Sequence, residues 1–350
     1  MRVSIADVAR RAGVSISTVS RVINRRELVN AETRQRVDQA IAELGYRPNM
    51  FARGLMLRKS DMLGLALPDV HGEFYSEVIR GANAKARELG YHLVISSTKG
   101  PEDAQTLLED LLRRSIVDGM AIMVSEEPGG RPWERLETRL PLVLLDGAVE
   151  NGEHDSVVID QRAGAQALMR HLVRRCGMQR ILFMGGLTTN VDTLARRQVY
   201  EEIMRAADLP VSPEDVYHLD FQYETAYAFA RDRVKGWAGS QHCVFAANDE
   251  MACAVIDAAT EARVRVPQDL AVVGFDDTRI ARMTRPPLTT VRVPMSTMGA
   301  TAIELLCKRL ADPDQPPTHV SLTPQLIVRE SCGAAQQAGV QPAPGDTHVA

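Results

Sequence analysis

Residues 13–26, GVSISTVSRVINRR, combine short hydroxyl side chains with cations. The segment holds three serines, one threonine and three arginines. Hydroxyl and guanidinium groups bind phosphate oxygens, and small side chains let a helix enter the major groove of DNA. The segment therefore indicates a DNA-reading helix, and the alternative is a solvated amphipathic helix that carries its arginines by chance.

Local signals predict that this helix is the second of three. Ser4 and Asp7 have the spacing of a capping box, so a first helix should begin at residue 5 and end near Gly13, which can turn the chain sharply. A third helix should begin at an Asn30 cap and end at Gly45. The pattern predicts a small all-α head of helix-turn-helix form.

The second helix should begin at a Ser15 cap and bury one face. The side chains expected on its inner face are Val19, Val22 and Ile23. The side chains expected on its other faces are Ile16, Ser17, Ser20 and Arg21. This arrangement leaves hydroxyl groups and one arginine free for a partner.

Charge is distributed unevenly along the 350 residues. Residues 1–60 carry twelve Lys and Arg against five Asp and Glu, while the other residues carry 29 against 40. A basic head on an acidic body indicates a polyanionic partner for the head alone.

The cysteines give no sign of a disulfide framework or of a zinc site. They are Cys176, Cys243, Cys253, Cys307 and Cys332. Their number is odd and none forms a C-x-x-C pair, so we expect no metal and no cofactor, and a reducing compartment fits. No signal-peptide pattern or run of about 18 apolar residues is present, so a cytoplasmic protein without membrane contact is expected.

From Met62 onward, apolar runs alternate with amphipathic helices. This alternation is typical of parallel sheets with helices on both faces. Two such series follow one another, so the fold class is α/β: a small helix-turn-helix head followed by a two-lobed body with a cleft between its lobes.

Longer stretches carry a resemblance to a known family. VSIADVARRAGVSISTVSRVIN and LVNAETRQRVDQAIAELGYRPNMFARGL, with FAANDEMA, AVVGFDD and PPLTTVRVPMSTMG in the body, resemble the LacI/GalR family of bacterial repressors over roughly residues 3–330. The resemblance implies a periplasmic-binding-protein-like body that binds an effector, and a homodimer that binds double-stranded operator DNA.

The resemblance also implies domain boundaries. It places the helix-turn-helix domain at 1–46, the hinge helix and linker at 47–60 and the effector-binding domain at 61–330. The first lobe would span roughly 61–161 and 292–322, and the second roughly 162–291 and 323–330. The tail, 331–350, is rich in Ala, Gln, Gly and Pro, and we expect it to be disordered.

In such a head, Ile16, Ser17 and Arg21 would occupy base-reading positions. Arg21 could present a bidentate fork to guanine. The residues that would position phosphates are Ser15, Thr18, Ser20 and Asn24, with Ser4, Asn30, Asn49, Ala52 and Arg53 as further DNA contacts. Leu55 matches the hinge leucine that wedges into a minor-groove step, and its alternative is a linker leucine packed on the body.

The resemblance places a sugar or polyol effector between the lobes, bound by carboxylate, amide and aromatic groups. Asp276 matches the principal hydroxyl acceptor, Asn248 and Arg196 its amide and guanidinium partners, and Phe221 an aromatic wall. Further candidates at strand ends of the first lobe are Phe74, Tyr75, Asp146 and Asp160. As alternatives, Asp276 could cap a turn and Phe221 could belong to the core. Val199 and Ala226 stand where the family pattern has glycine.

The resulting hypothesis is a sequence-specific transcriptional regulator, most simply a dimeric repressor on a pseudopalindromic operator, controlled by a carbohydrate effector. A nucleobase or a sugar phosphate is a lesser option for the effector, and induction and corepression stay open. The alternatives are a sugar-binding module without regulatory role and a carbohydrate-active enzyme with paired carboxylates. No phosphate-binding loop or nucleophile elbow supports an enzyme.

Overall fold

The computed structural model divides the chain into two compact units. It describes residues 3–24, 28–46, 59–97, 106, 110, 116–123, 140–146 and 154–334. The head comprises Met1–Asp61 with Ser115–Val117, and the body comprises Met62–Arg114 with Asp118–Ala350. The predicted hinge contacts Asn49, Ala52, Arg53 and Leu55 lie outside the described residues, as does the tail from residue 335.

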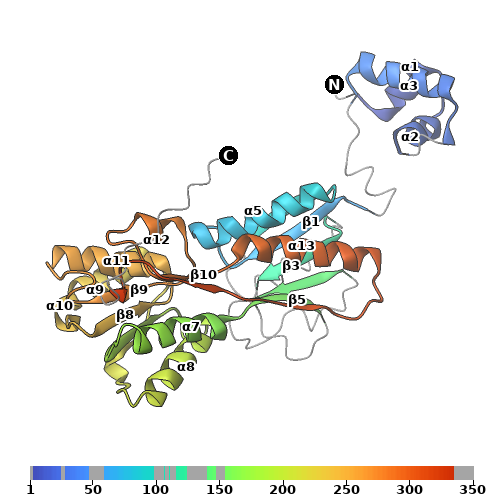
Figure 1. Ribbon diagram of the computed structural model, residues 1–350. Coiled ribbons are helices and arrows are strands. Elements are labelled where there is room, and N and C mark those ends of the chain that lie inside the picture. The colour runs from blue at the N-terminus through green and yellow to red at the C-terminus, as the bar shows by residue number, and fades with distance from the viewer. Residues whose placement is uncertain are drawn as a thin grey trace. The chain divides into compact units, whose positions relative to one another are not determined.

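The described residues of the head form three helices (Figure 1): α1 (Ile5–Ala12), α2 (Ile16–Asn24) and α3 (Ala31–Leu44). The predicted capping box is confirmed, because the Ser4 hydroxyl accepts from the Asp7 backbone N–H and the Asp7 carboxylate accepts from the Ser4 backbone N–H at 3.0 Å. Gly13 and Gly45 end α1 and α3 at φ values of 67° and 62°. This left-handed conformation is open to glycine without steric cost.

The core of the head consists of small aliphatic side chains. Its buried members are Val8, Ala9, Ala12, Val19, Val22, Val37 and Ala40. Val19 and Val22 confirm the predicted inner face of α2, and Ile23 packs against the same cluster. A core this small makes the head marginal by itself.

The prediction that Ser20 faces outward is wrong. Ser20 is 9% exposed, whereas Ile16 is 51% exposed and Ser17 and Arg21 are also exposed. The helical repeat places Ser20 at the edge of the face that carries Val19, where neighbouring atoms cover its short side chain. Ser20 is therefore less accessible to a phosphate than Ser17.

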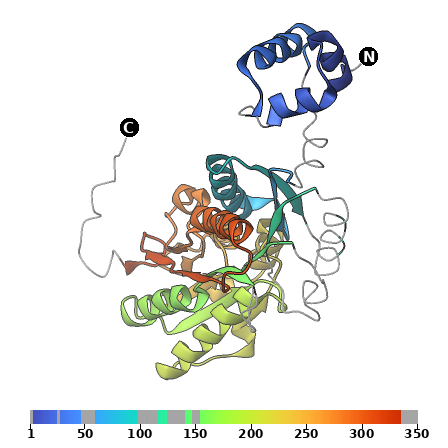
Figure 2. The ribbon, with the colours of Figure 1, turned by 90° about the vertical axis from the view of Figure 1, so that its right-hand side faces the viewer.

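The first lobe of the body is built on a six-stranded parallel sheet in the order β11-β5-β4-β3-β1-β2. The strands are β1 (Met62–Leu67), β2 (His92–Ser97), β3 (Gly119–Met123), β4 (Leu142–Leu145), β5 (Asp155–Ile159) and β11 (His319–Leu322). Helices α5 (Gly72–Glu88) and α13 (Met295–Ala311) run side by side over this sheet (Figures 1 and 2).

The second lobe has a four-stranded parallel sheet in the order β7-β6-β8-β9. The strands are β6 (Arg180–Gly185), β7 (Val216–His218), β8 (His242–Ala246) and β9 (Ala271–Val273). The helices of this lobe are α7 (Gln161–Arg174), α8 (Val191–Ala206), α9 (Tyr223–Arg231), α10 (Val234–Trp237), α11 (Asp249–Glu261) and α12 (Arg279–Met283), with a 3₁₀ turn at Pro213–Asp215. The predicted α/β class with parallel sheets is confirmed.

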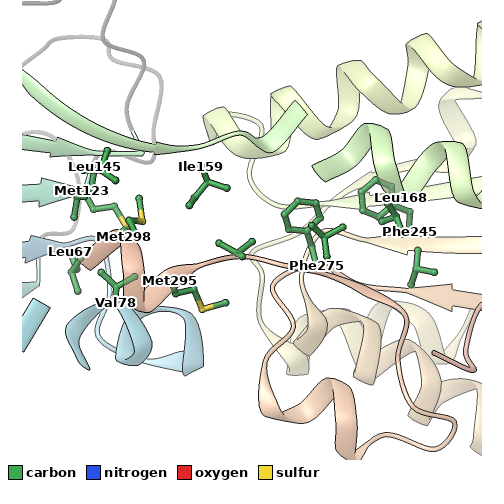
Figure 3. Close-up of a cluster of buried hydrophobic side chains, with 14 of the residues drawn as sticks. Leu67, Val78, Met123, Leu145, Ile159, Leu168, Phe245, Phe275, Met295 and Met298 are labelled. Carbon is green, nitrogen blue, oxygen red and sulfur yellow. The ribbon is translucent and has the colours of Figure 1, made fainter. Parts of the chain in front are cut away.

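Three segments carry the chain between the lobes. One joins β5 to α7, and the others contain β10 (Thr290–Arg292) and β12 (Gln325–Ile327), which pair antiparallel. A continuous apolar cluster accompanies them: Figure 3 shows it extending from Leu67 and Met123 through Ile159 to Phe275. The two lobes are therefore packed against one another as well as linked.

The expectation of disorder from residue 331 is wrong for residues 331–334. Ser331 and Cys332 are fully buried. The Ser331 hydroxyl donates to the Val272 carbonyl at 2.6 Å and accepts from the Thr289 backbone N–H at 2.8 Å. Buried hydrogen bonds of this kind fix the segment, which composition alone does not reveal.

None of the helices in the described parts of the chain is both long enough and apolar enough to cross a membrane.

Candidate functional site

The outward face of α2 gathers predicted DNA contacts of the head. Ser15 Oγ lies 2.7 Å from Ser17 Oγ and 2.8 Å from Thr18 Oγ1, and it accepts from the Thr18 backbone N–H at 3.1 Å. Ser15 thus caps α2, as predicted. Three hydroxyl groups cluster where free backbone N–H groups and the helix dipole attract anions. Ile16 and Arg21 are exposed along the same helix.

Two other predicted DNA contacts are helix caps. Ser4 caps α1, and Asn30 Oδ1 accepts from the Thr33 backbone N–H at 2.8 Å to cap α3. The side chain of Asn24 lies outside the described part of the chain. Ser4 and Asn30 therefore stabilise helix N-termini of the head, whether or not they also contact DNA.

A pocket of about 260 Å³ is lined by residues of both lobes of the body. Its walls lie at the carboxyl ends of parallel strands, where ligands bind in open α/β sheets. The residues that follow or end these strands and line the pocket are Pro68, Asp69, Met123, Asp146, Asn248, Asp249 and Asp276. The first turn of α5 adds Phe74 and Tyr75.

The pocket is strongly acidic. Eight carboxylates line it: Asp69, Glu73, Asp146, Asp192, Asp220, Asp249, Glu250 and Asp276. Among the described residues, Arg196 is the sole lysine or arginine in the lining. Acidic groups in such excess over cations disfavour anions and favour a ligand that forms hydrogen bonds with carboxyl groups.

Arg196 is buried, at 4% exposure, and held by contacts on every side. Its Nε and Nη2 donate to Gln161 Oε1 at 3.0 and 2.8 Å, and its Nη1 donates to the Ala247 carbonyl at 2.6 Å. The guanidinium carbon lies 3.9 Å from the centre of the Phe275 ring. Arg196 is thus a fixed cation that partly offsets the surrounding carboxylates.

Asp276 and Asp277 have opposite environments. The Asp277 carboxylate accepts from Arg292 Nε at 2.7 Å and from Arg329. Asp276 is 8% exposed and lines the pocket, and no described residue donates a hydrogen bond to its carboxylate. Burial raises the pKa of Asp276 well above its usual range, with neighbouring carboxylates adding to the effect and Arg196 opposing it. A ligand that donates to this carboxylate would favour its ionised form.

Backbone strain marks the same place. Asp146, Phe221 and Asp276 have φ values of 55°, 66° and 110°, and all three line the pocket. Positive φ is rare for such residues and clusters at ligand sites, where the surrounding structure holds it. Burial, with a smaller contribution from Asp192, raises the pKa of Asp146 as well.

The amide of Asn248 positions Phe221. Asn248 Oδ1 accepts from the Met251 backbone N–H at 2.9 Å, and Nδ2 donates to the Phe221 carbonyl at 2.9 Å. The Phe221 ring lies so close to Gly186 that a Cβ there would be 2.0 Å from it. Phe221 is half-buried, packs on the core of the second lobe and also lines the pocket. The two interpretations from the sequence, an aromatic pocket wall and a core residue, therefore each describe part of its environment.

The first lobe contributes an aromatic pair. Phe74 and Tyr75 pack edge to face with ring centres 5.3 Å apart, and both line the pocket. Asp160 does not line it, since its carboxylate caps α7 by accepting from the Ala163 backbone N–H at 2.8 Å. All the predicted effector residues except Asp160 are brought together here.

Several lining residues were not predicted. Asn190 caps α8, and Asp192 lies one helical turn before Arg196, with 3.9 Å between their charged groups. This i, i+4 spacing was a signal that could have identified Asp192. For Asp249 the only sequence signal was its position beside Asn248. The three hydrogen bonds that its carboxylate accepts from Thr278 and Thr290 depend on tertiary structure.

Both departures from the family's glycines are accommodated. Val199 and Ala226 are fully buried within α8 and α9. Neither lines the pocket.

One hydrogen bond joins the lobes at the edge of the pocket. Glu73 Oε2, on α5, accepts from the backbone N–H of Arg279, at the start of α12, at 2.8 Å. The first turn of a helix favours a carboxylate. This contact is suited to stabilise the relative position of the lobes.

Comparisons with known proteins agree with this architecture. Residues 4–49 match the family described as bacterial regulatory proteins, lacI family, and residues 169–332 match the periplasmic binding protein-like domain. The ribose operon repressor of Escherichia coli (strain K12) is 33% identical over 332 residues, which cover 94% of this chain and 99% of that protein.

Two solved structures are similar over nearly the whole chain. The lac repressor dimer bound to operator and the anti-inducer ONPF has a TM-score of 0.84 at 27% identity, covering 95% of this chain and 99% of that one. The transcriptional regulator CelR in complex with cellobiose has a TM-score of 0.70 at 30% identity, covering 94% and 100%.

Proposed function

Because the chain belongs to the LacI family of bacterial regulatory proteins and is a transcriptional repressor with an effector-binding domain, we propose two finer properties. It binds a pseudopalindromic operator in the cytoplasm as a dimer. A small, neutral, hydroxyl-rich effector in the pocket between its lobes controls its affinity for that operator.

The exposed face of α2 supports the operator part of the proposal. Arg21 and the hydroxyl cluster of Ser15, Ser17 and Thr18 are on the surface of a helix that the head core holds in place. Arg21 would read a guanine, which is worth about 1–3 kcal/mol at one base pair. The hydroxyls would bind phosphates and set the register of the helix.

Operator binding can be tested with DNA selected from a random pool. Arg21→Ala should lose discrimination at one base pair of each half-site. Arg10→Ala is the control, since Arg10 is also exposed but pairs with Asp7 on α1. An equal change in both variants would mean that Arg21 contributes only charge.

The carboxylate of Asp276 is the observation that carries the effector part. It is buried, sits on a strained backbone and lacks a donor among the described residues. A buried carboxylate without donors is costly, so the site is suited to a ligand that supplies them. Sugar hydroxyls donate such hydrogen bonds, and Phe74, Tyr75 and Phe221 offer apolar surface to sugar C–H groups.

The charge of the pocket argues against anionic effectors. A sugar phosphate would bring its charge among eight acidic side chains, and Arg196 already donates to Gln161 and Ala247. Charge repulsion of this kind is a common basis for rejecting a ligand. Neutral sugars and polyols are therefore favoured over sugar phosphates and sugar acids.

A thermal-shift screen tests this directly. Neutral sugars, sugar acids, sugar phosphates and nucleobases are compared on the full chain, on Asp276→Asn and on Asp269→Asn. A ligand at about 100 times its Kd should stabilise the native protein by about 2.7 kcal/mol. Asp276→Asn should abolish the shift, while Asp269→Asn, which changes a half-buried partner of Arg265 outside the pocket, should keep it. A strong hit among the anions that survives Asp276→Asn would contradict the proposal.

Coupling between the pocket and DNA follows from differential binding. An effector that favours one arrangement of the lobes shifts operator affinity by the coupling free energy, about 1–3 kcal/mol or 5 to 150-fold in typical cases. Operator titrations with and without effector give the sign, induction or corepression.

The dimer is supported by the likeness to the lac repressor dimer. Residues 333–350, GAAQQAGVQPAPGDTHVA, contain no leucine heptad. Sedimentation should show a dimer at micromolar concentration, and a stable tetramer would contradict this part of the proposal.

A further inference from the structure

Three potential metal ligands meet inside the second lobe, away from the pocket. His171 Nε2 lies 3.3 Å from Cys176 Sγ and 3.4 Å from Cys332 Sγ. All three ligand atoms lie within 4.8 Å of one another. Cys176 and Cys332 are 2% and 0% exposed, and His171 is partly exposed. None of the three lines the effector pocket.

The fold creates this cluster from distant parts of the chain. His171 is on the last turn of α7 and Cys176 follows that helix, whereas Cys332 follows β12 in the segment that returns to the second lobe. The Thr289 hydroxyl, just before β10, donates to Cys332 Sγ at 3.2 Å. The cysteine spacing that argued against a zinc site therefore did not reflect the tertiary arrangement.

The distances match those between ligands of one metal ion. Zinc binds imidazole nitrogen at about 2.0–2.1 Å and thiolate sulfur at about 2.3 Å. At a tetrahedral angle these lengths place nitrogen and sulfur about 3.5 Å apart, close to the two separations seen here. We propose that His171, Cys176 and Cys332 bind one thiophilic d10 cation, Zn²⁺ or Cu⁺.

The donor set selects soft ions. Among the described residues, the cluster offers two sulfur atoms and one imidazole nitrogen, and no carboxylate belongs to it. Thiolates favour Cu⁺ and Zn²⁺, whereas Mg²⁺ and Ca²⁺ require oxygen ligands.

Binding would join the end of α7 to the C-terminal segment. Both elements flank the crossovers between the lobes, because α7 follows the first crossover and Cys332 follows β12. A bound ion would therefore stabilise the second lobe and the segment 331–334, and thiol protons would be released as the ion binds.

The test uses the full chain, reduced and freed of metal. Zn²⁺ and, anaerobically, Cu⁺ are titrated against a chromogenic chelator, and Co²⁺ is used as a spectroscopic probe of thiolate ligation. We expect one ion per chain, thiolate-to-cobalt charge-transfer absorption and a higher Tm with the ion. Cys332→Ala and Cys176→Ala should no longer bind one ion tightly and should lose the absorption band. Cys253→Ala, which removes a thiol outside the cluster, should keep both.

Two readouts separate loss of the site from loss of the fold. Circular dichroism verifies that each variant is folded, and alkylation rates of the wild type are compared with and without the ion, since both thiols are buried in either case. Slower alkylation of Cys176 and Cys332 in the presence of the ion supports the site even where a variant unfolds. Binding that persists in Cys332→Ala, or absence of tight binding to the wild type, would overturn the proposal and leave a hydrogen-bonded cluster without an ion.

Discussion

Substituting Gly299 with alanine should loosen the crossing of α5 and α13. A Cβ at residue 299 would lie 2.0 Å from the Val78 carbonyl oxygen and 2.9 Å from the Ala82 nitrogen. Both obstacles are backbone atoms of α5, so no change of rotamer relieves the clash and the helices must separate. Close packing makes such separation costly.

The magnitude follows from two opposing effects. Alanine gains about 1 kcal/mol over glycine in a helix interior. Overpacking a well-packed core costs about 1–3 kcal/mol and occasionally more, and the Cβ would fall well inside van der Waals contact here. We therefore expect a net loss of about 2 kcal/mol, or about 4–8 °C in Tm for a body of this size.

Thermal melts followed by circular dichroism measure this loss, with Gly236→Ala as the control. Gly236 is in α10, and a Cβ there would meet nothing within 4 Å. The control should leave Tm unchanged or raise it slightly. A Gly299→Ala protein that melts at or above the wild-type temperature would refute the reasoning, because the close approach of the helices would then carry no energetic weight.

Three further predictions concern charge and capping. Burial raises the pKa of Asp249 from 3.8 to about 7. The protonated carboxyl therefore contributes stability that is complete below the lower value and is lost as pH rises through the higher one. In urea titrations the free energy of unfolding of the wild type should fall by about 2–3 kcal/mol between pH 5 and pH 8 from this group, and Asp249→Asn should remove that fall. Glu73→Ala removes the hydrogen bond to the Arg279 backbone and should change effector affinity, measured by calorimetry, up to about fivefold. Glu77→Ala, which removes an ion pair with Arg80 within α5, should leave the Kd of the effector unchanged. Ser4→Ala removes the capping box of α1 and should destabilise the head by about 1 kcal/mol. Amide hydrogen exchange should then become faster in α1 and stay unchanged in the body, provided that the head unfolds separately.

The amino-acid sequence alone determined the features that depend on short-range interactions. Ser4, Ser15 and Asn30 cap their helices as predicted, and Gly13 and Gly45 end them, because each of these hydrogen bonds joins residues a few positions apart. The alternation of apolar runs and amphipathic helices likewise predicted parallel sheets, since burial on both faces leaves a direct mark on the pattern.

The tertiary structure decided which polar groups are free and which are occupied. Asp276 and Asp277 are adjacent, yet only the Asp277 carboxylate accepts hydrogen bonds from arginines, Arg292 of β10 and Arg329 beyond β12. Asn248 was predicted as a ligand group, but its amide holds the Phe221 backbone as well as capping α11.

The same limit explains Ser20, Asp160 and the cluster of His171, Cys176 and Cys332. Neighbouring atoms cover Ser20, and Asp160 turns its carboxylate to the first turn of α7. Cys332 reaches His171 only because β12 brings the chain back to the second lobe. The physical reason is one of range: caps and periodicity are fixed within one or two helical turns, whereas burial, hydrogen-bond partners and ligand clusters depend on residues that the fold brings together from far apart in the chain.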